Sequence, residues 1–309
     1  MTTLSERIVQ RQIVLTEGAV IERLRRSPGI VLDPLVENAA LVYDASGRAA
    51  LLDLWRGYVD VARESGLPIT IFAPTWRASP ERLARAGLPA TSRVCADAVA
   101  LVREVRCEYG SFGERIHVAG LMGCRGDAYR VDGALTSAEA LEFHAEQADA
   151  LAATGLDLIL AATLPSADEA LGLARAISRT AVPYILGFVV RASGTLLDGT
   201  PLRDAVARLD DALDRPPLGY AGTCVHPENF RRALERERVT PRFVALQGNG
   251  SRLSPEELDG RGDVDSDSPE AFATASADVA RRFGLSMVGG CCGTDDRHLR
   301  ALAKALTRP

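Results

Sequence analysis

Three of the six cysteines in the chain have the spacing of a metal site. Cys291 and Cys292 are adjacent within Gly289-Gly-Cys-Cys-Gly-Thr, and Cys224 precedes them in Gly222-Thr-Cys. Neighbouring cysteines seldom form a disulfide with each other, because the resulting ring is strained. Three thiolates that leave one tetrahedral position open are typical of catalytic zinc. The alternative is that the three thiols are small buried side chains with no ligand.

The elements that would position these thiols alternate along the chain. Short segments that are nearly all apolar, without alternation of polar and apolar residues, indicate strands buried on both faces. Eight such segments are predicted, at residues 12–16, 68–73, 115–121, 156–162, 183–190, 217–223, 242–246 and 285–290. Helical patterns lie between them, at residues 49–65, 137–154, 166–178, 269–283 and 295–307.

Eight strand–helix units predict a single (β/α)8 TIM barrel, an α/β fold, over residues 1–309. Two domains, or one doubly wound open sheet, are the alternatives, but no Gly-x-Gly-x-x-Gly follows the first strand. Cys224 ends the sixth predicted strand, and Cys291 and Cys292 follow the eighth. Active sites of such barrels form at the carboxyl ends of the strands. The fold therefore predicts that the three thiols converge there.

Charge and hydropathy narrow the possible partners. The chain has 36 Lys and Arg against 41 Asp and Glu, a net charge of −5. A nucleic-acid partner normally requires a clustered basic excess, so none is expected. No apolar run is long enough to span a membrane, and early charges argue against a secretory signal. We expect a cytoplasmic protein, since free thiols are normal in a reducing compartment.

With these motifs, the chain resembles the homocysteine S-methyltransferase family. The double-cysteine motif is the most specific point of similarity, and Gly222-Thr-Cys is similar to the family's Gly-x-Asn-Cys element, with Thr223 in place of Asn. Leu15-Thr-Glu-Gly is similar to its Leu-Asp-Gly segment, with Glu17 in place of Asp. Ala73-Pro-Thr-Trp-Arg-Ala-Ser is similar to its Thr-Asn-Thr-Tyr-Gln-Ala-Ser.

The resemblance implies an enzyme with Zn²⁺ on Cys224, Cys291 and Cys292. It implies transfer of a methyl group from a sulfonium donor, S-adenosylmethionine or S-methylmethionine, to a thiol, with homocysteine giving methionine. The metal would hold the acceptor as a thiolate, so no further catalytic side chain is expected. The positions that match the family's substrate-binding segments are Glu17, Gly18, Thr75, Thr163 and Asn249. Arg77, after the second strand, is a further candidate that would bind a carboxylate.

One departure from the family pattern concerns the acceptor. The family's Glu-Thr-x-Pro element, whose Glu helps to hold the amino group of homocysteine, is replaced here by Ala162-Thr-Leu-Pro. A buried ammonium needs a counter-charge. Either Glu17 compensates, or the acceptor is another thiol. Betaine, folate and corrinoid donors, and a zinc barrel that binds a thiol without turnover, remain alternatives. The sequence does not indicate the oligomeric state.

The segment 247–268, after the seventh predicted strand, is rich in Gly, Asp, Ser and Pro. In a barrel this segment lies at the mouth of the site. It is either a lid or a solvated insertion.

Overall fold

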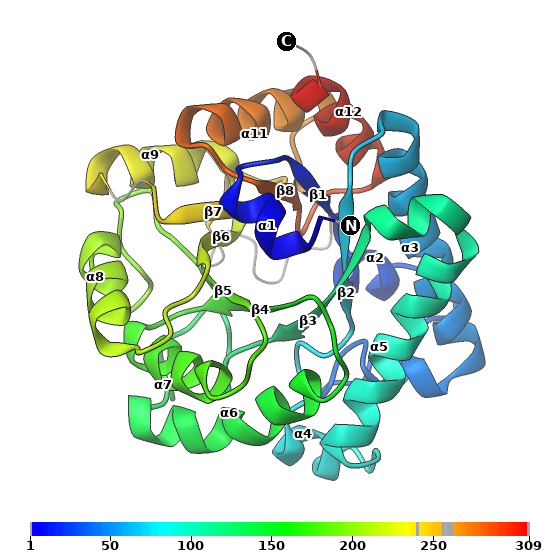
Figure 1. The fold of residues 1–309 in the computed structure, drawn as a ribbon, viewed down its shortest axis with the longest axis horizontal. Coiled ribbons are helices and arrows are strands. Elements are labelled where there is room, and N and C mark those ends of the chain that lie inside the picture. The colour runs from blue at the N-terminus through cyan, green and yellow to red at the C-terminus, as the bar shows by residue number, and fades with distance from the viewer. Residues whose placement is uncertain (1, 239–240, 255–256, 258–262, 308–309) are drawn as a thin grey trace.

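Eight parallel strands close into one barrel in the computed structural model, which describes residues 2–238, 241–254, 257 and 263–307. Strand order follows chain order, and the first strand pairs with the eighth, so the predicted TIM barrel is confirmed and the open sheet was the wrong alternative (Figure 1). The strands are β1 (Val14–Thr16), β2 (Ile69–Ala73), β3 (Ile116–Met122), β4 (Leu158–Leu164), β5 (Tyr184–Phe188), β6 (Gly219–Val225), β7 (Phe243–Gly248) and β8 (Met287–Gly290).

Helices surround the barrel on its outside, as Figure 1 shows. The longer ones are α3 (Ala45–Ser65), α5 (Thr91–Glu108), α6 (Ser137–Ala152), α7 (Ala167–Ser178), α8 (Leu202–Ala212), α9 (Pro227–Glu237), α11 (Pro269–Phe283) and α12 (Asp296–Thr307). The shorter ones are α1 (Leu4–Val9), α2 (Ile21–Arg25), α4 (Pro80–Arg85) and the 3-10 turns η1 (Ala40–Tyr43) and η2 (Gly110–Arg115).

Local capping explains several of the helix boundaries. Thr136 and Glu139 form the expected capping box at the start of α6. Gly284 ends α11 in the left-handed conformation. Asp44 accepts a hydrogen bond from the Gly47 N–H, and α3 therefore begins four residues before its predicted start.

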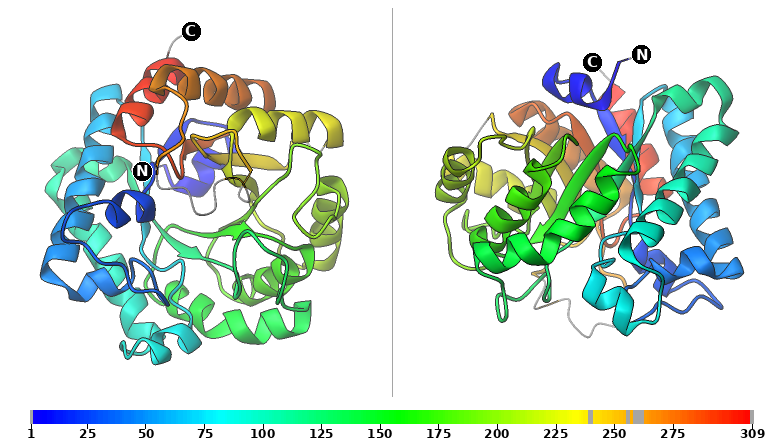
Figure 2. Two further views of the ribbon diagram at one scale, coloured as in Figure 1. Left: turned by 180° about the vertical axis from the view of Figure 1, so that it is seen from behind. Right: turned by 60° about the horizontal axis from the view of Figure 1, so that its bottom comes forward.

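The barrel interior is an apolar cluster distinct from the layer between strands and helices. Val14, Phe72, Leu160 and Met287 belong to the interior cluster, and every residue of β1, β2, β4, β5, β6 and β8 is buried. The short helix α1 contributes Leu4 and Ile8 to this same cluster. It therefore closes the amino-terminal end of the barrel, where Figures 1 and 2 show it. Only the carboxyl ends of the strands remain available for a site.

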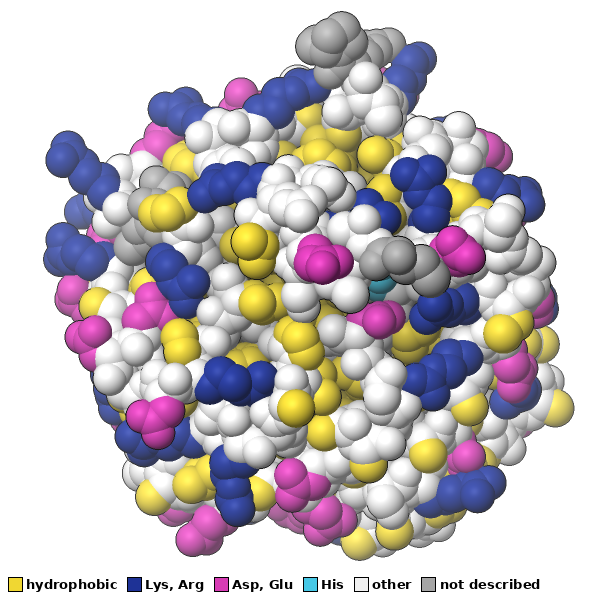
Figure 3. All heavy atoms as spheres, viewed as in Figure 1, with side chains coloured by type: hydrophobic (Ala, Val, Ile, Leu, Met, Phe, Trp, Pro, Cys, Tyr) yellow, Lys and Arg dark blue, Asp and Glu magenta, His cyan; other side chains and the backbone are white. Residues whose placement is uncertain are grey.

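The surface carries charges of both signs. Figure 3 shows basic and acidic side chains interspersed over the face that α1 covers, with no extended patch of one sign. None of the helices in the described residues has the length and apolarity needed to cross a membrane.

The plug formed by α1 generates a prediction with a matched control in the same helix. Ile8 is 3% exposed and Val9 is 73% exposed. We expect Ile8→Ala to lower the free energy of unfolding by about 2–5 kcal/mol, because it leaves a cavity in the barrel floor. Val9→Ala should change it by less than about 0.5 kcal/mol. Urea unfolding of both variants measures this, and equal effects would contradict the assignment of α1 as a plug.

Candidate functional site

The ends of β6 and β8 bring three thiols together. The Sγ atoms of Cys224, Cys291 and Cys292 all lie within 4.8 Å of one another, and those of Cys224 and Cys292 are 3.7 Å apart. Tetrahedral zinc with Zn–S bonds of about 2.3 Å requires sulfur atoms roughly 3.8 Å apart. The donor set and its spacing therefore fit zinc with one position left for another ligand.

Cys224 reaches this position through a strained backbone. Its φ is 54°, and the register between β6 and β7 shifts between Thr223 and Val225. A non-glycine residue in the left-handed region costs on the order of 1–3 kcal/mol and is concentrated at functional sites. The bulge at this strand end turns the Cys224 side chain toward the pair on β8.

Glycines allow the adjacent pair to lie against the barrel. Gly293 has a φ of 79°, as expected for a tight turn. Gly289 and Gly290 serve a different purpose, because a Cβ atom on either would collide with Thr16 or Thr294. The backbone N–H of Cys291 donates to the carbonyl of Gly248 on β7 over 2.7 Å, which fixes the pair to the neighbouring strand.

The three thiols share their protons unequally. Hydrogen bonds from Cys291 and Cys292 hold the pKa of Cys224 well below its ordinary value. Their bonds to Cys224 raise the pKa of both partners. The hydroxyl of Tyr129, from the segment after β3, also donates to Cys224 Sγ over 2.9 Å. The cluster therefore favours a first thiolate at Cys224.

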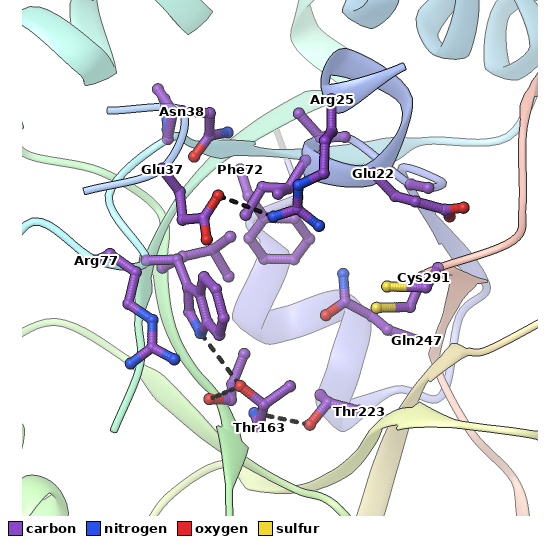
Figure 4. Close-up of a pocket in the computed structure, with 18 of the residues that line it drawn as sticks. Glu22, Arg25, Glu37, Asn38, Phe72, Arg77, Thr163, Thr223, Gln247 and Cys291 are labelled. Carbon is purple, nitrogen blue, oxygen red and sulfur yellow. Dashed lines mark hydrogen bonds and ion pairs between the residues drawn. The ribbon is translucent and has the colours of Figure 1, made fainter. Parts of the chain in front are cut away.

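A cavity of about 530 Å³ opens beside these thiols. Figure 4 shows Cys291 on one side of it and Arg77 on the other, with Phe72, Thr163 and Gln247 between them. Four of the six predicted substrate contacts line the cavity, namely Glu17, Gly18, Arg77 and Thr163. These four come from the ends of β1, β2 and β4.

Thr75 and Asn249 are not among the cavity-lining residues. The Thr75 hydroxyl donates to the Leu121 carbonyl (2.8 Å) and accepts from the Leu121 N–H (3.0 Å), so it joins the ends of β2 and β3. The backbone N–H of Asn249 donates to Val225, and its side chain is buried beside the cavity wall. Their predicted contact with substrate finds no support in this geometry.

Sequence reasoning missed several lining residues. Phe72, Trp76, Tyr129 and Gln247 all face the cavity. Phe72 lies within a predicted strand and Gln247 begins the segment 247–268, and their apolar or amide side chains carry no signal of their own. Tyr129 lies well past β3, so only the folded path of that segment brings it to Cys224. Trp76 stood out as a departure from the family pattern, and its position next to Arg77 was the available signal.

A hydrogen-bonded row connects three strands across the site. Trp76 Nε1 donates to Thr163 Oγ1 (3.1 Å), and the Thr163 N–H donates to Thr223 Oγ1 (2.9 Å), as Figure 4 shows for the two threonines. Thr163 also has a φ of 54°, at a register shift in β4. The bulge in β4 is thus bonded to the residue that precedes Cys224.

The sequence comparisons agree with this geometry. The sequence model of the family described as "Homocysteine S-methyltransferase" matches residues 14–306. The chain belongs to this family. The homocysteine S-methyltransferase of Escherichia coli is 30% identical over 323 aligned positions, which cover 95% of each protein. Homocysteine S-methyltransferase YbgG of Bacillus subtilis is 26% identical over 58% of this chain, a match that spans only about half (56%) of the Bacillus protein.

The barrel also matches a solved structure. The homocysteine methyltransferase MmuM from Escherichia coli, in its metallated form, superposes with a TM-score of 0.76 over 96% of this chain and 98% of that one. At 22% identity this likeness supports the fold. Membership of the homocysteine S-methyltransferase family makes the chain an enzyme of homocysteine S-methyltransferase type.

Part of the segment 247–268, for which a lid and a solvated insertion are the two alternatives, lies outside the described residues, namely 255–256 and 258–262. Its described parts are hydrogen-bonded to the loop that carries the cysteine pair. The Gly250 N–H donates to the Cys292 carbonyl (2.8 Å), and Ser266 Oγ donates to the Gly293 carbonyl (2.7 Å). These bonds hold the segment's ends beside the cysteine pair.

Glu17 is the buried acid of the cavity. Burial raises the pKa of its carboxyl to about 8, although a hydrogen bond from the Phe72 N–H (3.2 Å) acts in the opposite direction. Ala162, which also lines the cavity, adds no charge. Near neutral pH, burial of Glu17 therefore favours its protonated form.

The raised pKa of Glu17 makes a prediction about stability. An unfolded glutamate releases its proton near pH 4.5, whereas folded Glu17 keeps its proton until about pH 8. Between these values the folded state binds more protons, so stability falls as pH rises. In metal-free protein, Glu17→Gln should remove more than about 1 kcal/mol of this decline. Urea unfolding from about pH 5 to pH 8 measures it.

Glu142→Gln, on an exposed position of α6, is the matched control. It should leave the pH dependence of the parent chain in place. If Glu17→Gln also leaves that dependence in place, Glu17 is ionised in the folded chain.

Proposed function

We propose that the protein is a zinc-dependent S-methyltransferase, which moves a methyl group from a sulfonium donor to a small-molecule thiol such as homocysteine. One observation supports this most strongly. Three thiols with the spacing that zinc requires line up beside a cavity that is large enough for a small molecule. S-adenosylmethionine and S-methylmethionine are the donors to test first.

Cys224, Cys291 and Cys292 would hold the metal. Zinc on three thiolates, when bound, supplies a site at which an acceptor thiol is ionised at neutral pH and stays nucleophilic. The remaining task falls to positioning, which alone can contribute several kcal/mol to a displacement reaction. Thr223 and Thr163 fix the strand ends on the metal side, and Trp76 and Phe72 form the wall that excludes water.

The reaction balances without a redox partner. The acceptor loses its thiol proton to solvent, and its sulfur forms a bond to the donor's methyl carbon. The bond from that carbon to the donor sulfur breaks, and the donor leaves as a neutral thioether. No buried histidine faces the cavity among the described residues, in keeping with a reaction that needs no separate base.

The function is tested by loading the protein with zinc and assaying methyl transfer from each sulfonium donor to homocysteine. We expect about one zinc per chain and formation of the methylated thiol. Cys292→Ser should lower zinc affinity and kcat/KM by more than the roughly 10–100-fold that indirect changes around a metal cost. Metal analysis and product detection by mass spectrometry give both readouts.

Cys107→Ser is the matched control, because Cys107 is an exposed free cysteine far along the chain from the cluster. It should bind zinc and turn over as the parent does. A Cys292→Ser protein that keeps both zinc and activity would overturn the site. Zinc and thiol binding without transfer from sulfonium, betaine or folate donors would instead make the barrel a binding protein.

A further inference from the structure

The two sides of the cavity differ in charge. The cysteine pair lies on one side, and Arg77 lies on the other, as Figure 4 shows. An acceptor whose sulfur reaches the cysteines must therefore direct its other end toward the Arg77 side. The groups on that side determine which thiols fit.

Arg77 is held rigidly on its side of the cavity. It is 9% exposed, and its Nη1 donates to the carbonyls of Cys124 (2.7 Å) and Gly126 (2.6 Å). Its guanidinium also packs on the indole of Trp76, 4.0 Å from the ring centroid. Both carbonyls bind the same nitrogen, so the planar group is oriented without any carboxylate partner.

The positive charge on this side is not neutralised by the described residues. Arg25 at the rim forms an ion pair with Glu37 (3.0 Å). Within the part of the chain that the structure describes, Arg77 and Arg82 form no such pair, and Arg82 donates to the carbonyls of Leu35 and Arg125. Burial is the main cause that lowers the pKa of Arg82; the charge of Arg77 lowers it further, whereas Cys124 and Glu81 act in the opposite direction. Buried cations need a counter-charge, and a ligand can bring it.

The described residues of the wall between the two sides are apolar and provide no carboxylate for an ammonium group. Phe72 and Ala162 belong to the apolar interior cluster, and Trp76 and Leu121 pack against it. The indole N–H of Trp76 is already bonded to Thr163. The one acid in this inner part of the cavity is Glu17, whose burial favours the protonated form, and the lining acids Glu22 and Glu37 are paired with arginines. Asp127, also a lining residue, is exposed.

We infer that the acceptor is a mercaptocarboxylate, bound through its carboxylate at Arg77, and that an α-ammonium group adds nothing to its recognition. This inference rests on the proposed function and names the substrate class of the same site. A planar guanidinium held by its neighbours matches a carboxylate in geometry and charge. Homocysteine would be accepted for its carboxylate, and its des-amino analogue would be accepted at least as well.

Four thiols with the same three-carbon chain distinguish the contribution of the carboxylate from that of the ammonium group. They are homocysteine, 4-mercaptobutyrate without the ammonium, 3-aminopropane-1-thiol without the carboxylate, and propane-1-thiol with neither. We expect kcat/KM for 4-mercaptobutyrate to equal or exceed that for homocysteine. Loss of the carboxylate should lower kcat/KM about 10–100-fold, the usual value of a hydrogen bond to a charged group. Calorimetric binding to the zinc-loaded protein should give the same order.

Variants at two positions, Arg77 and Ala162, assign the preference to residues. Arg77→Gln should reduce the ratio of 4-mercaptobutyrate to propane-1-thiol about 10-fold or more, and Arg77→Lys should restore part of it. Ala162→Glu places a carboxylate on the apolar wall and should raise kcat/KM for homocysteine relative to kcat/KM for 4-mercaptobutyrate. Arg85→Gln, at an exposed arginine of α4 outside the cavity, is the control and should leave every ratio unchanged.

The outcomes distinguish the inference from the function. A strong preference for homocysteine over 4-mercaptobutyrate overturns the inference and leaves the methyltransferase intact. Equal use of propane-1-thiol also overturns it, in favour of an apolar acceptor. Tight binding of 4-mercaptobutyrate that depends on Arg77, without methyl transfer from any donor, supports the inference and overturns the proposed function.

Discussion

The structure depends on keeping three sulfur atoms together that come from two strands separated by a third. Bringing ionisable thiols within 4.8 Å of one another is unfavourable unless they share protons or a cation. Hydrogen bonds along β6, β7 and β8 hold the strand ends at fixed spacing. Since the barrel closes through β1, none of these strands is a free edge. Closure of the barrel therefore holds together three thiols from two parts of the chain that are far apart in the sequence.

The strand ends at the site are irregular, and the irregularities depend on one another. Thr163 and Cys224 are both in the left-handed region, at bulges in β4 and β6. The bond between the Thr163 N–H and Thr223 Oγ1 joins these two bulges across β5. Trp76 extends the same row to the end of β2. The strained backbone at Cys224 is thus accompanied by hydrogen bonds that also shape the wall of the cavity.

The sequence could predict the barrel and the thiols because both signals are local. Buried strands lack polar alternation, and Cys291 and Cys292 mark a strand end by adjacency alone. Contacts that depend on the direction of a side chain could not be predicted from the sequence. Thr75 shares a segment with Arg77, yet its hydroxyl turns to Leu121 while the arginine reaches the cavity. Tyr129 reaches Cys224 only through the path of an irregular segment, which no periodicity encodes.

The effect of alanine at position 162 depends on the charges of Glu17 and Arg77 in the same cavity. Ala162 belongs to an apolar cluster and adds no carboxylate, and the burial of Glu17 favours its neutral form. On the opposite side, Arg77 is oriented by carbonyls that satisfy its geometry but not its charge. A single anionic group on a ligand neutralises that side, whereas a zwitterion brings an extra cation toward a wall without a ready counter-charge. Arg77 is therefore the group of the cavity with which the carboxylate of an acceptor would pair.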